Sequence, residues 1–287
     1  MPSTRTGLLR LARPADARRQ AEAWRAEGLS IGLVPTMGAL HRGHLSLVER
    51  ARAENDRVIV SVFVNPLQFG PGEDFERYPR DLQGDLTKLE AAGADAVYTP
   101  SVQAMYPPSA TTRVLVGEVA EPLEGKSRPG HFEGVATVVL KLFEACRPDR
   151  AYFGQKDAQQ AAVVTRMARD LDTGVEIVVS PTVREPDGLA LSSRNAYLSA
   201  AERRAALVLS RALEAANQAW AGGERDPARL RAVLHEVLAA EPLAAVDYAE
   251  VVDPATFRPG VPLAVMAVRV GGTRLIDNHP LGTLFRT

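Results

Sequence analysis

The chain has 287 residues, which is enough to bury a large core and predicts one large domain or two modest ones. Its formal net charge is −1 and its arginines are spread along the sequence, so no nucleic-acid-binding surface is expected. No uncharged apolar run is long enough to span a bilayer, and the first residues lack the apolar core of a secretory signal. Cys146 is the only cysteine, which excludes an internal disulfide and favours a packing role. The composition is typical of a soluble cytoplasmic enzyme.

Apolar runs typical of strands alternate with helical patterns over the first two thirds of the chain. The predicted strands are 31–34, 58–64, 96–98 and 175–179, and the main predicted helices are 45–55, 82–92, 135–146 and 158–171. This alternation predicts βαβ units around a parallel sheet, which is a Rossmann-like α/β domain. Ligands of such sheets bind beyond the carboxyl ends of the strands. We therefore expect site residues in the segments 35–44, 65–70 and 181–184, each of which follows a predicted strand.

The pattern changes beyond about Glu185. An alanine- and arginine-rich helix is predicted over 200–221, a second helix over 228–239, and strands over 246–252 and 263–270, with a turn at Gly271-Gly272 leading into 274–276. These elements predict a smaller α+β domain. We expect a Rossmann-like, ligand-binding domain over 1–185 and a smaller C-terminal domain over 186–287 that covers the site.

The most informative segment runs from Pro35 to His44 and contains two histidines, His41 and His44. An apolar strand pattern precedes it and an amphipathic helical pattern follows, so the histidines are predicted near a helix N-terminus. Unpaired backbone N–H groups and the positive end of the helix dipole favour polyphosphate there, and Gly38 and Gly43 leave room for the backbone to approach it. The positive end of the dipole disfavours the protonated form of the histidines, whereas a bound phosphate favours it and so restores a proton donor. The segment predicts a nucleotide-phosphate site; helix capping or ring packing is the alternative.

A second polar cluster begins at Phe153-Gly154, where an apolar run turns through glycine into a helix. Lys156 can donate to a phosphate, Asp157 can accept from ribose hydroxyls, and Gln160 lies one helical turn further on. The alternative is an aspartate-capped helix with a solvated lysine.

A third cluster spans Asp187 to Asn195 and contains Ser192, Ser193 and Arg194. Two hydroxyls beside an arginine suit the outer phosphates of a triphosphate. By themselves these residues are also ordinary loop chemistry.

In this order the three clusters resemble the pantothenate synthetase family, of the nucleotidylyltransferase-like group that also includes class I aminoacyl-tRNA synthetases. The resemblance is nearly continuous from Pro35 to Asn195, and the smaller C-terminal region has the length that the family expects. It also includes the segments Val64-Asn65-Pro66-Leu67-Gln68-Phe69-Gly70, Tyr78-Pro79-Arg80, Arg128-Pro129-Gly130-His131-Phe132, Gly154-Gln155-Lys156-Asp157 and Leu191-Ser192-Ser193-Arg194-Asn195.

The resemblance implies a two-step reaction. Pantoate carboxylate attacks the α-phosphate of Mg-ATP, which releases pyrophosphate and leaves pantoyl adenylate; the amine of β-alanine then attacks this anhydride and yields pantothenate and AMP. Such chemistry requires positioning and charge neutralisation more than a protein nucleophile. By the same resemblance the catalytic residues are His44 as proton donor, His41 and Lys156.

By the resemblance, the domain over 1–185 binds ATP and pantoate, and the domain over 186–287 covers the active site. The resemblance also assigns individual ligand contacts. Gln68 is implied at pantoate and β-alanine, and Gln160 at pantoate, because neutral amides can pair with hydroxyl and carboxylate groups without adding charge. Gly154, Asp157 and Val183 are implied at ribose and adenine. The full set implied at ATP is Met37, Gly38, Ala39, Leu40, His41, Arg42, Gly43, His44, Gly154, Gln155, Lys156, Asp157, Val183, Leu191, Ser192, Ser193 and Arg194.

Some positions depart from the family pattern. Leu191 stands where methionine is frequent, which is a nearly volume-conserving exchange. Gln155 stands where an acidic residue is common, and Gly84 precedes Asp85 where relatives often have a further carboxylate. Asp85, with Asp81 as the other option, is the remaining protein candidate for Mg²⁺, and substrate phosphates and water are expected to supply most ligands.

Two questions stay open at the level of sequence. His131 follows Arg128 in a glycine-rich loop, where it either contacts ligand or orders the loop. The resemblance further implies a homodimer whose contacts the sequence does not define.

Two other functions compete with the ligase. An adenylyltransferase acting on a phosphorylated coenzyme precursor would share the histidine motif, but it does not account for Gln68 and Gln160 and needs further cationic phosphate ligands. A nonenzymatic nucleotide-sensing module would keep the adenine and ribose contacts without needing both histidines together with Lys156 and Arg194.

Overall fold

The computed structural model describes residues 7–285. The first six residues, on which the prediction of no secretory signal partly rests, lie outside the described residues. The chain forms two compact units. The first consists of the described part of Met1–Val116 with Arg128–Gly154 and Val163–Ser180, and the second of Gly117–Ser127, Gln155–Ala162 and the described part of Pro181–Thr287.

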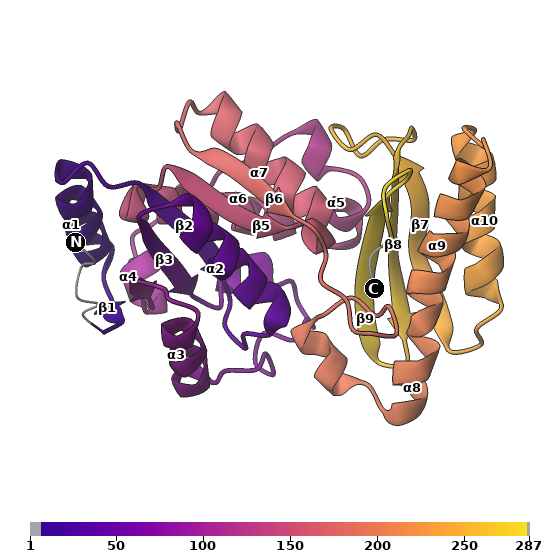
Figure 1. Cartoon of the computed structure of the whole chain (residues 1–287), viewed down its shortest axis with the longest axis horizontal. Coiled ribbons are helices and arrows are strands. Elements are labelled where there is room, and N and C mark those ends of the chain that lie inside the picture. Colours follow the sequence, from indigo (N-terminus) through magenta and orange to yellow (C-terminus); the bar gives the residue numbers. More distant parts are fainter. Residues whose placement is uncertain (1–6, 286–287) are drawn as a thin grey trace. The chain divides into compact units, whose positions relative to one another are not determined.

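The first unit contains a six-stranded sheet in the order β1-β4-β3-β2-β5-β6, and every pair in it is parallel (Figure 1). The strands are β1 (Leu9–Leu11), β2 (Ile31–Thr36), β3 (Arg57–Val62), β4 (Ala96–Tyr98), β5 (Arg150–Gly154) and β6 (Glu176–Ser180). Because β2 lies between β3 and β5 and is parallel to both, the carboxyl ends of these three strands are neighbours at one edge of the sheet. Chain segments leaving this edge are therefore the first candidates for ligand contacts.

Helices connect these strands. They are α1 (Pro14–Ala26), α2 (Arg42–Glu54), α3 (Leu82–Ala91), α4 (Val102–Met105), α6 (His131–Cys146) and α7 (Ala158–Asp170), of which α7 begins in the second unit, and the short turn η1 (Pro66–Gln68) follows β3. Helix α2 packs against β2, β3 and β5, whereas α1 packs against α6. The predicted Rossmann-like parallel sheet is thus confirmed.

The core of the first unit is built from β-branched and aliphatic side chains of the central strands. Ile31, Leu33 and Ile59 are completely buried, as expected for parallel strands covered on both faces. Cys146, at the end of α6, is also completely buried, and burial raises the pKa of its thiol to about 12. This agrees with the packing role that the sequence favoured.

The second unit contains an antiparallel sheet in the order β7-β8-β9, with α9 and α10 packed against it (Figure 1). Its elements are η2 (Glu118–Ala120), α5 (Glu124–Ser127), η3 (Gln155–Asp157), η4 (Ser193–Tyr197), α8 (Ala200–Ala205), α9 (Leu207–Ala221), α10 (Pro227–Ala239), β7 (Ala244–Val252), β8 (Leu263–Val270) and β9 (Thr273–Pro280). Leu213, Leu230 and Leu234 are completely buried in its core. The predicted α+β character is confirmed.

The elements that were not predicted include β1, α1 and β5 and the short helices α4 and α5, and the single helix expected over 200–221 is divided at Ala206 into α8 and α9. Of these differences, β5 matters most for the site. It places Gly154 at the carboxyl edge of the sheet beside β2, so that the second polar cluster begins there. Among the described residues, none of the helices combines the length and apolar character needed to cross a membrane.

Candidate nucleotide and substrate site

The turn between β2 and α2 is held by a buried carboxylate of α3. Gly38 and Ala39 adopt left-handed backbone conformations, with φ angles of 85° and 51°. The N–H groups of Ala39 and Leu40 each donate to Asp85 at 2.8 Å, and Asp85 is only 1% exposed. A side chain at Gly38 would place a Cβ 3.0 Å from the same carboxylate, so glycine is required there. Asp85 therefore anchors the turn that presents the two histidines.

The two histidines lie at the N-terminus of α2, as predicted. His41 is its N-cap residue, and its Nδ1 accepts from the N–H of Gly43 at 3.2 Å. His44 Nδ1 accepts from the N–H of His41 at 3.4 Å, and the ring centroids are 4.1 Å apart. Because both Nδ1 atoms are acceptors, the proton of each neutral ring is on Nε2. Helix capping and ligand contact are thus compatible: Nδ1 caps the helix and Nε2–H is a donor suited to phosphate oxygen.

Gln68 lies in η1, and its amide is oriented by Asn65. Asn65 Nδ2 donates to Gln68 Oε1 at 3.0 Å and to the carbonyl of Gly134 at 3.0 Å. Gln68 Nε2 lies 3.4 Å from Met37 Sδ, in the turn that precedes the histidines. The predicted substrate amide and the predicted nucleotide turn are therefore neighbours within the first unit. Asn65 is 1% exposed and lies in the predicted segment 65–70, but no role was assigned to it from sequence, because its contacts with Gln68 and α6 depend on the fold.

The backbone of Gln68 is fixed by a cluster of Glu73, Arg128 and His131. Arg128 donates to the two carboxylate oxygens of Glu73 at 2.7 Å each, and its Nη1 lies 3.1 Å from His131 Nε2. His131 Nδ1 lies 2.9 Å from the carbonyl oxygen of Gln68, which only accepts, so Nδ1 carries the proton and Nε2 accepts from Arg128. Burial raises the pKa of Glu73, but its hydrogen bonds and charge interaction with Arg128 outweigh burial and leave that pKa lowered. Of the two roles considered for His131, these contacts favour ordering of the loop.

The second polar cluster forms η3, directly after β5. Lys156 Nζ lies 3.9 Å from Asp157 Oδ1, and the lysine side chain is 20% exposed. The neighbouring glutamines differ sharply. Gln159 is buried and donates to the carbonyls of Val119 and Pro122, whereas Gln160 is half-buried and its amide forms no hydrogen bond with another described residue. The Gln159 amide is thus used in hydrogen bonds to the backbone within the second unit, whereas the Gln160 amide is available to a ligand.

The third cluster follows a narrow loop of the second unit. Leu191 N–H donates to the carbonyl of Val183 at 3.0 Å, which brings these two predicted nucleotide contacts together. Ser192 caps η4, since its hydroxyl accepts from the N–H of Arg194 at 3.2 Å. Arg184, inside the loop, pairs with Asp277 of β9 through contacts of 2.6 and 2.9 Å. The loop is therefore attached to β9 by the buried Arg184–Asp277 ion pair, which was not predicted from sequence.

The predicted site residues are distributed over both units. In the first unit they are Met37, Gly38, Ala39, Leu40, His41, Arg42, Gly43, His44, Gln68, Asp85 and Gly154; in the second they are Gln155, Lys156, Asp157, Gln160, Val183, Leu191, Ser192, Ser193 and Arg194. Over residues 7–285, no group of three or more histidine, cysteine, aspartate or glutamate side chains is arranged to hold a metal ion.

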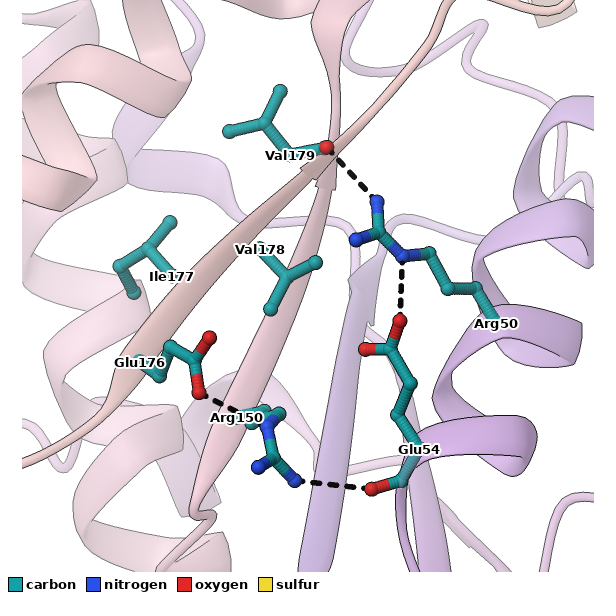
Figure 2. Close-up of a pocket in the computed structure, with 7 residues that line it drawn as sticks. All are labelled: Arg50, Glu54, Arg150, Glu176, Ile177, Val178 and Val179. Carbon is teal, nitrogen blue, oxygen red and sulfur yellow. Dashed lines mark hydrogen bonds and ion pairs between the residues drawn. The ribbon is translucent and has the colours of Figure 1, made fainter.

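A hollow on the first unit is lined by α2, β5 and β6 (Figure 2). Its residues are Arg50, Glu54, Arg150, Glu176, Ile177, Val178 and Val179, none of which belongs to the predicted site. Arg50 pairs with Glu54 at 3.0 Å, and Arg150 pairs with Glu176 at 2.9 Å. The charges of this hollow thus pair with one another, and we assign no ligand to it.

The parallel sheet and the histidine-bearing turn at a helix N-terminus define a nucleotide-binding α/β protein of the Rossmann type. Comparison with known families makes this more specific. Residues 10–280 match the family described as pantoate-beta-alanine ligase. The chain belongs to this family.

Individual relatives agree with this assignment. The chain is 58% identical to the pantothenate synthetase of Rubrobacter xylanophilus over 283 residues, which cover 93% of this chain and 97% of that protein. It is 60% identical to that of Roseiflexus castenholzii over 257 residues, covering 87% and 91%. Among solved structures, a pantothenate synthetase from Thermus thermophilus aligns with a TM-score of 0.90 at 48% identity, covering 96% of this chain and 99% of that one.

A further solved structure is the pantoate-beta-alanine ligase of Francisella tularensis, complexed with beta-gamma ATP and beta-alanine. It aligns with a TM-score of 0.81 at 34% identity and covers 97% of this chain and 100% of that one. As a member of this family, the chain is an AMP-forming ligase that condenses pantoate with β-alanine at the expense of ATP. The alternative of an adenylyltransferase acting on a coenzyme precursor is not favoured by these matches.

Proposed function

We propose that the chain makes pantothenate through pantoyl adenylate, and that the histidine-bearing turn is the centre of the adenylation step. The observation that carries this proposal is the paired orientation of His41 and His44, whose Nδ1 atoms both accept backbone N–H groups. Two Nε2–H donors at the N-terminus of one helix are suited to the charge that develops on phosphate oxygens during in-line attack.

In the first step, a carboxylate oxygen of pantoate bonds to the α-phosphorus of ATP while the bond from that phosphorus to the bridging oxygen breaks. His44 donates to the phosphates, His41 supports it, and Lys156 with the Ser192–Arg194 segment neutralises the departing pyrophosphate. The backbone of the β2–α2 turn approaches the phosphates, while Gly154, Asp157 and Val183 hold ribose and adenine. The remaining proposed ATP contacts are Met37, Gly38, Ala39, Leu40, Arg42, Gly43, Gln155 and Leu191.

In the second step, the amine nitrogen of β-alanine bonds to the acyl carbon of the adenylate, AMP leaves, and the nitrogen loses a proton. Gln68 is proposed to contact pantoate and β-alanine, and Gln160 to contact pantoate. Both side chains are neutral, so they can bind hydroxyl and carboxylate groups without changing the charge balance around the anhydride.

Magnesium is proposed to enter as Mg-ATP. The carboxylate of Asp85, which was the candidate ligand, accepts two backbone N–H groups and is 1% exposed. A resident metal centre built on this side chain therefore does not fit its surroundings. Mg²⁺ bound through phosphates and water is consistent with its usual coordination.

The family resemblance also supports action in the cytoplasm as a homodimer. Light scattering is expected to give a mass of twice the 30.9 kDa of one chain. A monomer mass at micromolar concentration would contradict the dimer.

A pyrophosphate-release assay tests the proposed function directly. With ATP and pantoate alone, the enzyme should release no more than about one pyrophosphate per site, because the adenylate stays bound; β-alanine should make release continuous. Continuous release with a phosphorylated coenzyme precursor, and none with pantoate, would instead identify the adenylyltransferase.

Replacing either substrate glutamine by leucine should weaken pantoate binding roughly tenfold or more. Gln68→Leu and Gln160→Leu preserve side-chain bulk but leave substrate groups unpaired, which costs on the order of 1–3 kcal/mol. ATP affinity without pantoate should change little. Calorimetric titration of each ligand checks this, and a loss of ATP affinity with unchanged pantoate affinity would show that the amides serve the nucleotide.

Gly134→Ala should impair pantoate binding from a distance. A Cβ at Gly134 would collide with the carbonyl oxygen of Leu67 and lie 2.6 Å from the backbone nitrogen of Gln68. The η1 turn must shift to accommodate this Cβ. A misplacement of a substrate-positioning group by about 1 Å can lower the reaction rate by a factor of about 100. We expect a higher KM for pantoate and an unchanged KM for ATP. An unchanged pantoate KM in the folded variant would show that the position of η1 is not critical.

A further inference from the structure

Asn278 of β9 makes three hydrogen bonds to the turn that carries Lys156. Its Nδ2 donates to the carbonyl oxygens of Gln155 and Lys156, at 2.9 Å each, and its Oδ1 accepts from Gln155 Nε2 at 2.9 Å. Asn278 is 4% exposed. A single buried amide thus fixes two consecutive peptide carbonyls of η3 through its nitrogen and the Gln155 side chain through its oxygen.

Asn278 is itself held rigidly. Its N–H donates to Asp277 Oδ1 at 2.8 Å, and its carbonyl accepts from Arg184 at 3.3 Å. The side chains of Arg184 and Asp277 form an ion pair at 2.6 Å and are 3% and 2% exposed. Asn278 also pairs with Val265 of β8 in the antiparallel ladder. The amide therefore projects from a strand whose position is defined by backbone pairing and by a buried charge pair.

We propose that Asn278 is a positioning residue for adenylate formation, acting through Lys156. The proposal rests on the assignment of Lys156 to the departing pyrophosphate. A lysine side chain is a flexible four-carbon stem with a point charge at its end, so the place its ammonium reaches depends on the backbone from which it starts. Asn278 fixes this backbone because it binds two consecutive carbonyl oxygens, that of Gln155, which precedes Lys156, and that of Lys156 itself.

The test compares the two half-reactions in Asn278→Ala and Asn278→Asp. The alanine variant leaves space in which water can pair with the freed carbonyls, and the aspartate variant retains an acceptor for Gln155 while removing the donors. Each should slow single-turnover formation of pantoyl adenylate by about tenfold to a hundredfold. Reaction of preformed pantoyl adenylate with β-alanine should change less than about twofold, because no pyrophosphate departs in that step.

Asn217→Ala is the matched control for lost packing in the same unit. The side-chain amide of Asn217 also forms two hydrogen bonds with the backbone: its nitrogen donates to the carbonyl of Thr283 at 3.0 Å, and its oxygen accepts from the N–H of Gly282 at 2.8 Å. It should lower the melting temperature without changing either half-reaction. Equal losses of both steps in the Asn278 variants, or no loss of adenylation, would overturn the positioning role.

A double variant identifies the residue through which Asn278 acts. If the effect passes through Lys156, Asn278→Ala should slow adenylation no further in a Lys156→Ala background, since coupled residues are not additive. Additive losses would overturn the proposal. If Lys156→Ala alone leaves adenylation intact, the assignment of Lys156 fails and the proposal falls with it; if only the Asn278 variants are intact, the assignment of Lys156 stands.

Discussion

His44→Ala is expected to slow pantoyl-adenylate formation by roughly 100-fold to 1,000-fold, the usual cost of removing one positioned donor to a developing oxyanion. His44 is half-buried in the first turn of α2, and its Nδ1 is occupied by the N–H of His41. The fold should survive because the hydrophobic face of α2 is formed by Leu47, Val48 and Ala51. Positional isotope exchange in ATP with pantoate measures the step without β-alanine.

His41→Ala should have a smaller effect on the same step and a larger effect on stability. Its Nδ1 caps α2, and losing an N-cap costs about 0.5–2 kcal/mol. His235→Ala is a suitable control, because His235 lies in α10 and contacts the carbonyl of Ala249 at 3.0 Å. Isotope exchange at the wild-type rate in both His41 and His44 variants would refute the roles proposed for the histidine pair.

The parts of the fold that were predicted are those with a strong local pattern. Strand β8 coincides with the expected 263–270, because seven of its eight residues are buried and apolar side chains dominate it. Helix α1 was missed because it buries only Ala17, Ala21 and Trp24 among charged neighbours, and alanine gives little hydrophobic periodicity. Strand β1 has three residues, of which only Leu11 is buried. Its position depends on pairing with β4, a contact that no local pattern encodes.

In the candidate site, too, the residues that were predicted are those with a local sequence pattern. The histidines could be placed at a helix N-terminus from sequence because strand, turn and helix are consecutive. The residues that fix these segments could not be identified from sequence in this way, because their partners are distant in the chain. Asp85 binds the backbone of Ala39, and Asn278 binds the backbone of Lys156. Segments 117–127 and 155–162 likewise belong to the second unit, whereas a boundary read along the chain near Glu185 does not include them. Contacts between residues that are distant in the sequence depend on tertiary packing, which local propensity does not determine.

Lys156→Ala should separate the two half-reactions most clearly. The ammonium is proposed to stabilise charge only while pyrophosphate departs, so adenylate formation should fall on the order of 100-fold, as for loss of a preorganised electrostatic group. Reaction of preformed pantoyl adenylate with β-alanine should change little, because AMP is the leaving group in that step. Rapid-quench measurements of each step over a single turnover provide the comparison, with Lys126→Ala, an exposed lysine of α5 in the same unit, as the control. Equal losses in both steps would assign Lys156 to the AMP moiety or to the architecture of η3, and the neutralisation of pyrophosphate would then have to come from Arg194.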